Sequence, residues 1–156
     1  MSHAHILTSL TEREAITDAL YRAIIGFDSN DVAILNSAFS GEDVDIVFNG
    51  NPISGLDAVR TQLLDFVGPM DTTHMINNVR VDFRDGASTA SLTAYALAQH
   101  CPPGRGNEPD GPKFLAASEY FIDLVKDKSD GVWKIKKWAM KIIWSQGDAS
   151  VMQRPG

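Results

Sequence analysis

Two histidines, His74 and His100, have the side chains and the spacing best suited to chemistry in this chain. They flank Arg84-Asp85-Gly86, a sequence typical of a tight hairpin turn, ten residues before Arg84 and fourteen after Gly86. An antiparallel hairpin about this turn places both imidazoles at the same end of a sheet. Because the pKa of an unperturbed histidine is about 6.5, the pair predicts a general acid–base site.

The strand that ends at His100 predicts an inner surface made mostly of small side chains. Side chains alternate between the two faces of a strand, so the residues at even positions share a face with His100. They are Ala90, Leu92, Ala94, Ala96 and Ala98. Because small side chains fill little space, we expect this face to border a cavity that has both histidines near its mouth.

Hydrophobic periodicity predicts the helices and strands that position this pair. Helices with one apolar face are expected over residues 12–27, 31–39 and 55–66, and the capping-box sequence Thr11-Glu12-Arg13-Glu14 begins the first. Strands are expected over 43–49, on both arms of the 72–101 hairpin, and over 113–126 and 132–144. This order predicts an α+β fold, with three helices packed on one face of a curved antiparallel sheet.

Two segments are expected to lack regular structure. Residues 101–112 contain four prolines and three glycines, which predicts a lid or a mobile loop directly after His100. The polar residues after Trp144 are expected to be loosely ordered. We interpret residues 1–156 as a single domain with an ordered core at about 10–147.

Charge and composition argue against several classes of protein. The net charge of −6 disfavours a nucleic-acid partner, because phosphate binding requires a positive surface. There is no apolar run of about 18 residues to cross a membrane, and the N-terminus lacks the pattern of an export signal. Cys101 is the only cysteine, so no internal disulfide can form. We therefore expect a cytoplasmic protein with no membrane or nucleic-acid partner.

Four features follow one another along the chain in a characteristic order. They are Phe27-Asp28-Ser29-Asn30-Asp31 at the end of the first predicted helix, Thr73-His74 at the start of a strand, His100, and Asp130-Gly131-Val132-Trp133-Lys134-Ile135 followed by Trp144. Together they resemble the SnoaL-like branch of the nuclear-transport-factor-2-like superfamily. Within that branch the chain is similar to the scytalone dehydratases, from about Leu10 to Gly147.

The resemblance implies a cone-shaped sheet with a central cavity and acid–base residues inside it. It implies that Asp28 orients His100, that His74 helps to move protons, and that Ser118 and Tyr120 form a polar pair near the substrate. An aspartate bonded to one ring nitrogen fixes the tautomer of a histidine and stabilises the imidazolium that forms on proton abstraction. Such a base can remove a proton from the carbon next to a carbonyl.

The chain departs from the scytalone dehydratases at two positions. Phe27 and, within one residue, Val47 stand where those enzymes have tyrosines that bind a water polarising the substrate's carbonyl. The resemblance therefore implies that acid–base chemistry is retained, whereas the group that polarises the substrate has been lost or moved.

Four further side chains are candidates for substrate contact. Trp138, Met140 and Trp144 alternate along the last predicted strand and are expected to wall an aromatic or terpenoid pocket, a pattern that suits core packing equally well. Tyr21 lies two helical turns before Asp28, where it is expected to reach the cavity floor as an acid.

Two other interpretations of the histidines remain open. They can be packed, hydrogen-bonded residues without chemistry. With Asp28 they also have the composition of a two-histidine, one-carboxylate metal site, although their spacing matches no metalloenzyme motif. We expect no metal and no cofactor.

The sequence therefore predicts a cofactor-independent lyase or isomerase: a dehydratase, isomerase or cyclase acting on a hydrophobic polyketide- or terpenoid-like compound of secondary metabolism. The alternative is a non-catalytic protein of the same fold, either a ligand-binding module or a structural subunit resembling the β subunit of aromatic-ring dioxygenases. An excess of large apolar side chains predicts a homodimer through the outer face of the sheet. Candidates for that face are Phe114, Phe121, Val125, Trp138 and Ile143.

Overall fold

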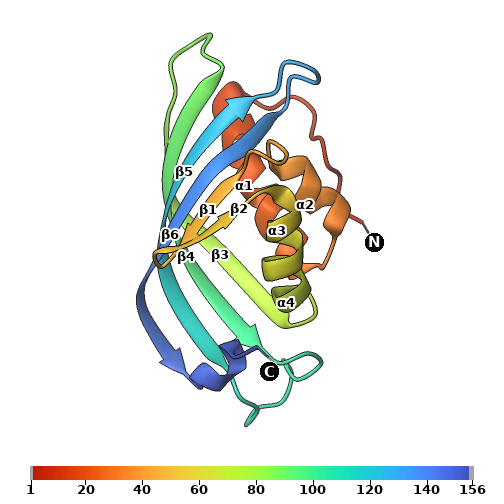
Figure 1. The fold of residues 1–156 in the computed structure, drawn as a ribbon, viewed down its shortest axis with the longest axis vertical. Helices are drawn as coiled ribbons and strands as arrows, with labels where there is room; N and C mark the ends of the chain where they lie inside the picture. The colour runs from red at the N-terminus through yellow and green to blue at the C-terminus, as the bar shows by residue number, and fades with distance from the viewer. Residues whose placement is uncertain (1, 155–156) are drawn as a thin grey trace.

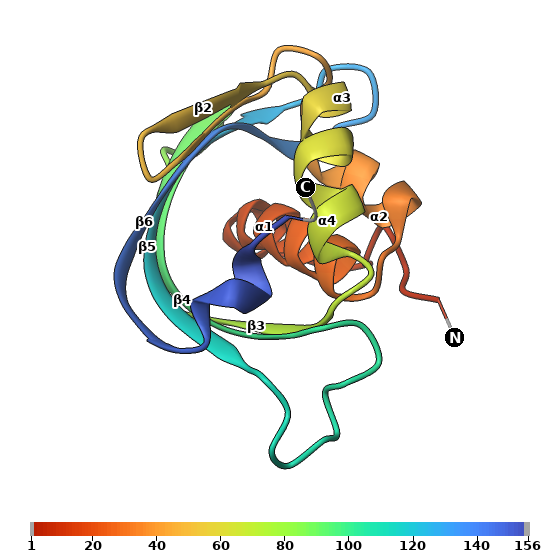
Figure 2. The same cartoon turned by 60° about the horizontal axis from the view of Figure 1, so that its bottom comes forward.

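A curved six-stranded sheet wraps around the helices and forms the framework of the molecule (Figure 1, Figure 2). The computed structural model describes residues 2–154. The strands lie in the order β2-β1-β6-β5-β4-β3, so the sheet does not close on itself. Their bounds are β1 Asp45–Phe48, β2 Asn51–Ser54, β3 Asp71–Asp82, β4 Thr89–Cys101, β5 Phe114–Lys126 and β6 Trp133–Gly147. The predicted α+β class is confirmed.

Three helical stretches lie on the concave side of the sheet (Figure 2). They are α1 (Glu12–Asp28), α2 (Val32–Ala38) and a continuous third stretch composed of α3 (Leu56–Val59), the π-helical η1 (Arg60–Leu64) and α4 (Asp65–Val67). The Thr11 side chain accepts a hydrogen bond from Glu14 N–H and so caps α1, as its sequence predicts. The apolar stripe of α1 is buried: Ile16, Ala19, Leu20, Ala23, Ile24 and Phe27.

Close packing of α2 fixes the end of α1, where Asp28 lies. A Cβ atom on Gly26 would stand 2.8 Å from Leu35 Cβ and 2.9 Å from its Cα, so only glycine allows the two helices to approach this closely. The Asp31 carboxylate then caps α2 by accepting hydrogen bonds from the N–H groups of Ala33 and Ile34. No helix within residues 2–154 has both the length and the apolar character needed to span a membrane.

The sheet differs from the prediction in two ways. The predicted antiparallel sheet is mixed, because β1 runs parallel to β6 while every other neighbouring pair is antiparallel. No hairpin turn joins β1 to β6, so no turn geometry imposes an antiparallel direction. The second difference is the short strand β2, which contains Pro52 and is not predicted from the sequence. This short strand lies at the edge of the sheet, where a proline that cannot donate to the ladder is tolerated.

Irregular pairing bends the long strands. The register shifts in β3 between Asn77 and Arg80. In β6 the extra residue is Ile143, because Ala117 of β5 pairs with Trp144 and Ser118 pairs with Ile142. Bulges of this kind increase the local bend and twist, and they change which face the following side chains occupy.

The loop at residues 102–112 contains no helix or strand, as predicted. Hydrogen bonds hold its central residues in place. The N–H of Gly106 donates a hydrogen bond of 2.8 Å to the Asp71 carboxylate at the start of β3. The Lys113 ammonium donates to the carbonyls of Gly106 and Glu108, at 3.2 Å each. The loop therefore lies at the end of the hairpin that carries both histidines, and its action as a lid stays a prediction.

Residues 145–154 are ordered, so the prediction of a loose tail is wrong over this range, and residues 155–156 lie outside the described residues. β6 continues to Gly147, whose φ of +107° turns the chain into the 3-10 helix η2 (Ala149–Met152). The N–H of Asp148 donates a 2.8 Å hydrogen bond to the Lys113 carbonyl. Val151 is buried, and η2 packs against β4 and β5 inside the curve of the sheet (Figure 2).

Arg154, the last described residue, binds this segment to the third helical stretch. The Arg154 guanidinium lies 5.2 Å above the Phe66 ring and donates a hydrogen bond to the Gln62 carbonyl. We call residues 148–154 the C-terminal strap. The strap crosses the concave side at the end of the sheet where His100 is found, and it covers the inner face there.

Candidate active site

A carboxylate–histidine pair joins the end of α1 to β3. The Asp28 carboxylate and His74 Nδ1 are 2.6 Å apart. The same carboxylate accepts hydrogen bonds from the backbone N–H of His74 at 2.9 Å and from the Thr72 hydroxyl at 2.8 Å. Since a carboxylate only accepts, the proton lies on Nδ1 of His74, and Nε2 keeps the lone pair of a base.

The second histidine lies beside this pair. The ring centroids of His74 and His100 are 5.5 Å apart with an interplanar angle of 82°. The Nδ1 of His100 is 3.1 Å from the carbonyl oxygen of Phe114, which can only accept, so Nδ1 of His100 carries a proton and its Nε2 is unprotonated in the neutral ring. His100 is 6 % exposed, and this burial lowers its pKa below the usual value for histidine. The ring is therefore neutral at neutral pH.

The predicted convergence of Asp28, His74 and His100 is confirmed, but the predicted pairing of Asp28 with His100 is wrong. His74 pairs with Ala98 and His100 pairs with Thr72 in the hairpin register, so both histidines lie on the inner face. α1 packs against β3, the strand that carries His74. The carboxylate at the end of this helix therefore reaches the histidine of β3, while the histidine of β4 bonds to β5.

Thr72 also belongs to the site, although it is not among the predicted site residues. It lies two residues before His74 on the same strand, so its side chain points to the same face and reaches the same carboxylate. The spacing of Thr72 and His74 was a usable signal for this contact.

Four other predicted residues lie on the inner face. The side chains of three of them are buried: Ser118 is 8 % exposed, Tyr120 3 % and Trp138 2 %. Met140 pairs with Tyr120 and therefore lies on the same face. Burial and the negative charge of Asp28 both raise the pKa of Tyr120. Because that charge acts on the phenol, Tyr120 is electrostatically linked to the carboxylate–histidine pair, while Trp138 packs against its ring at 5.1 Å.

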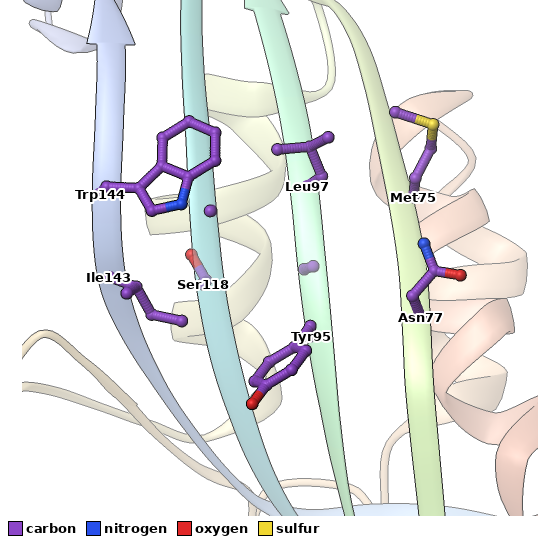
Figure 3. Close-up of a pocket in the computed structure, with 9 residues that line it drawn as sticks. Met75, Asn77, Tyr95, Leu97, Ser118, Ile143 and Trp144 are labelled. Carbon is purple, nitrogen blue, oxygen red and sulfur yellow. The ribbon is translucent and has the colours of Figure 1, made fainter.

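Two predicted residues, Tyr21 and Trp144, lie outside the site. Tyr21 is 40 % exposed on the surface of α1, so it does not reach a cavity floor. The bulge at Ile143 reverses the alternation of β6, so Trp144 pairs with the outward-facing Ala117 and is exposed. Figure 3 shows Trp144 on the side of the sheet away from the helices, with Tyr95, Leu97 and other residues that line a shallow outer pocket.

The inner face between these groups is covered by packed side chains. Four alanines of this face are buried: Ala94, Ala96, Ala98 and Ala116. They form the surface of short side chains that the alternating small residues predict. The central cavity stays a prediction. Residues 2–154 contain no cluster of three or more histidine, cysteine or acidic side chains arranged to hold a metal ion. The expectation of metal-free chemistry likewise stays a prediction.

The fold and the site define a small α+β protein whose curved sheet carries a carboxylate–histidine pair on its inner face. Residues 8–139 match the SnoaL-like domain, and the chain belongs to this family. The predicted family is therefore confirmed.

A protein of a fungal biosynthetic cluster is similar over nearly the whole chain. Terrestric acid biosynthesis cluster protein E of Penicillium crustosum is 41 % identical over 143 residues, covering 92 % of this chain and 90 % of that protein.

Two solved structures have the same fold at low sequence identity. One is a candidate scytalone dehydratase from Novosphingobium aromaticivorans, with a TM-score of 0.74, 24 % identity and coverage of 88 % of this chain and 87 % of the other. The other is hexachlorocyclohexane dehydrochlorinase LinA-type3 from Novosphingobium barchaimii, with a TM-score of 0.67, 22 % identity and coverage of 92 % and 94 %. At these identities the likeness concerns the fold alone.

Proposed function

We propose that this protein is an acid–base lyase or isomerase of secondary metabolism, acting on a hydrophobic polyketide- or terpenoid-like compound. The observation that carries the proposal is the 2.6 Å contact between Asp28 and His74 on the inner face of the sheet. The similarity to a biosynthesis cluster protein of Penicillium crustosum supports a role in secondary metabolism.

In the proposed reaction His74 is the base and Asp28 positions it. Nε2 of His74 accepts a proton from the carbon next to a carbonyl, and the imidazolium that forms is stabilised by the carboxylate at Nδ1. The proton then returns to another carbon, which gives isomerisation, or to a departing β-hydroxyl, which leaves as water. Acid–base steps of this kind need no cofactor.

His100 has a supporting role in this proposal. Its ring lies beside that of His74, and its Nε2 lone pair can accept a hydrogen bond from a substrate hydroxyl or relay a proton. A neutral His100 also avoids placing a second positive charge beside the imidazolium that forms on His74.

The proposal is tested by deleting the gene from a producing strain and comparing metabolite profiles. We expect one product to disappear and one precursor to accumulate, and we expect the purified protein to convert that precursor without added cofactor. Unchanged profiles, or a precursor that the purified protein binds but does not convert, would favour the non-catalytic alternative.

We also propose that the protein is a homodimer that uses the outer face of the sheet. Several large apolar side chains from different strands are exposed there: Met75 at 48 %, Tyr95 at 47 %, Phe121 at 48 %, Ile143 at 54 % and Trp144 at 49 %. All of these except Phe121 line a pocket of about 260 Å³ (Figure 3). Contiguous exposed apolar surface of this kind is typical of an interface, and two-fold dimers are the commonest assembly.

The structure corrects two candidates for this outer face. Trp138 is buried among the inner residues, and Phe114 pairs with His100 and lies against its ring at 6.1 Å. Phe121 and Ile143 are exposed, as the interface requires.

A further inference from the structure

One donor to the Asp28 carboxylate does not belong to the histidine that the carboxylate holds. Within residues 2–154 Asp28 accepts two hydrogen bonds from His74, through its backbone N–H and its Nδ1. The third comes from the Thr72 hydroxyl, 2.8 Å from Oδ1. A carboxylate only accepts, so the hydroxyl donates its proton there. Thr72 is therefore the described side chain that holds Asp28 independently of the base.

The side chain of an aspartate does not by itself fix the plane of its carboxylate. The torsion about the Cβ–Cγ bond has broad minima, so the donors around the two oxygens decide their orientation. Oδ1 accepts from Thr72 and from His74 Nδ1, the latter at 2.6 Å, whereas Oδ2 accepts from the backbone N–H of His74 at 2.9 Å. Without the Thr72 hydroxyl the carboxylate can rotate and keep the backbone contact, and its bond to Nδ1 then weakens.

The surroundings give this one hydrogen bond a large effect. The side chains of His74 and Asp28 are 12 % and 22 % exposed, so little water competes for the carboxylate. Hydrogen bonds to a charged group are stronger than neutral ones, and a low local dielectric strengthens them further. The close packing at Gly26 fixes the end of α1, so the rotation of the Asp28 carboxylate is the freedom that Thr72 restricts.

The neighbouring histidine does not depend on Thr72. Although Thr72 lies opposite His100 in the register of β3 and β4, Nδ1 of His100 is bonded to the Phe114 carbonyl of β5. The tautomer of His100 is therefore set from β5, and the tautomer of His74 from Asp28. A change at residue 72 should affect the His74 ring and leave the His100 ring as it is.

We propose that Thr72 is a positioning residue for the base, a role that rests on the function proposed above. Its hydroxyl holds the Asp28 carboxylate in the plane that keeps the proton of His74 on Nδ1. Nε2 of His74 then keeps the lone pair that accepts a proton from the substrate. Thr72 acts through the carboxylate and makes no bond to the reacting atoms.

The tautomer of His74 is measured without a substrate. The full-length protein is labelled with 15N-histidine, and the ring nitrogens are recorded by NMR at pH 9, where an imidazole is neutral. The chain has four histidines, and the signals of His74 are identified by their loss in His74→Ala. The variants are Thr72→Val, which replaces the hydroxyl by a methyl group, and Thr72→Ser, which restores it. Thr73→Val makes the same change on the exposed outer face of β3 and is the matched control.

We expect the proton of His74 to lie on Nδ1 in the wild-type protein. Thr72→Val should lower the ratio of the Nδ1–H to the Nε2–H tautomer by about 10-fold, the equivalent of one hydrogen bond to a charged group. Thr72→Ser should restore the wild-type ratio, Thr73→Val should not change it, and the His100 ring should be unaffected throughout. If Thr72→Val does not fold, as judged by its circular dichroism, Thr72→Ala provides the same comparison.

Turnover of the accumulated precursor gives a second readout. Thr72→Val should lower kcat by about 10-fold, because one hydrogen bond to the carboxylate is lost and the carboxylate remains. KM should stay within twofold of wild type, because the Thr72 hydroxyl is bonded to Asp28 and not to the substrate.

A purely structural role for Thr72 gives a different result. If its hydroxyl only joins α1 to β3, Thr72→Val lowers the free energy of unfolding but leaves the tautomer of His74 and kcat unchanged, and this result overturns the proposal. Failure here is separable from failure of the proposed function. Loss of precursor conversion in His74→Ala, together with an unchanged tautomer and kcat in Thr72→Val, would retain the acid–base reaction and reject only the role of Thr72.

Discussion

The carboxylate of Asp28 accepts three hydrogen bonds, two of them from His74 and one from Thr72. These contacts fix the position of the His74 ring and leave Nε2 unprotonated. A substitution that removes only the charge of residue 28 keeps the packing of the site. It therefore tests whether the carboxylate fixes the tautomer of His74.

Asp28→Asn should lower turnover of the accumulated precursor by about 10²–10³-fold, the contribution expected of one general base. The amide of asparagine can donate to Nδ1 of His74, which would move the proton to Nε2 and remove the base. The measurement is kcat of the purified variant, with Asp110→Asn in the exposed 102–112 loop as the control. Turnover within threefold of wild type in Asp28→Asn would contradict the role given to this carboxylate.

Burial of His100 predicts a pH dependence of stability. Because its pKa is lowered in the folded state, the unfolded chain takes up a proton first as the pH falls through about 6.5, and the free energy of unfolding decreases. The decrease continues down to the folded-state pKa and then levels off. The His74 ring lies beside this ring, and the Asp28 carboxylate contacts His74.

His100→Gln should reduce the difference between the free energies of unfolding at pH 7.5 and pH 5.5, measured by urea denaturation. His3→Gln, at an exposed position near the N-terminus, is the control and should leave the difference unchanged. An equal pH dependence in His100→Gln and wild type would show that another group is responsible.

The identity of the acid–base residues was predictable from the sequence, whereas their pairing was not. The positions of His74 and His100 follow from a turn and from strand alternation, which are local properties. The packing of α1 against β3 decides which histidine Asp28 contacts, and this packing is a property of the tertiary structure. The buried indole nitrogen of Trp138, which has no hydrogen-bond partner within residues 2–154, is likewise visible only when the strands are assembled.

At the scale of the elements, the C-terminal strap depends on Gly147. This residue has a φ of +107°, and an added Cβ would collide with the Lys113 carbonyl. Gly147→Ala should therefore add about 1–3 kcal/mol of local strain and loosen the strap. We expect faster hydrogen exchange in a peptide covering residues 148–154, measured by mass spectrometry.

Gly131→Ala is the matched control for this prediction. Its φ of +73° is also positive, but nothing lies within 4 Å of the added Cβ, and the residue is in the β5–β6 turn. Exchange in the strap should be unchanged in this variant. Equal exchange rates in Gly147→Ala and wild type would mean that the strap is not held by this turn.

Most elements were predictable, and the exceptions have physical reasons. Periodicity and capping predict the three helical stretches and the long strands within a few residues. The edge strand β2 is too short to show alternation, and its proline argues against a strand. The bulge at Ile143 leaves no local sign in the sequence, so Trp144 is assigned to the wrong face. The strap is mostly polar, and long-range contacts hold it: with β4 and β5, with the Lys113 carbonyl, and with Gln62 and Phe66 of the third helical stretch.

At the scale of the whole molecule, the exposed apolar face predicts the assembly. Ile143→Asp places a charge where the proposed interface is most apolar, so it should convert a homodimer into a monomer. The molar mass is measured by light scattering at micromolar concentration. Val32→Asp, on the exposed surface of α2, introduces the same charge elsewhere and should leave the dimer intact. A monomeric wild-type protein would refute the homodimer.

The fold class of the whole molecule follows from the order of its elements, but the curvature and the mixed sheet do not. The predicted order ααβαββββ, which lacks only β2, is typical of helices packed on one face of a sheet. The direction of β1 beside β6 is set by long-range packing, because no turn connects the two strands. Curvature arises from bulges that a pattern of alternating residues does not reveal.

The central claim, that His74 is the base held by Asp28, is tested most directly by the turnover of His74→Ala. The substrate is the precursor that accumulates in a strain lacking the protein, and the variant's circular dichroism and molar mass establish that it folds and assembles as the wild type does. We expect kcat to fall by at least about 10²-fold, because a general base is removed. A folded His74→Ala that converts the precursor at the wild-type rate would contradict it.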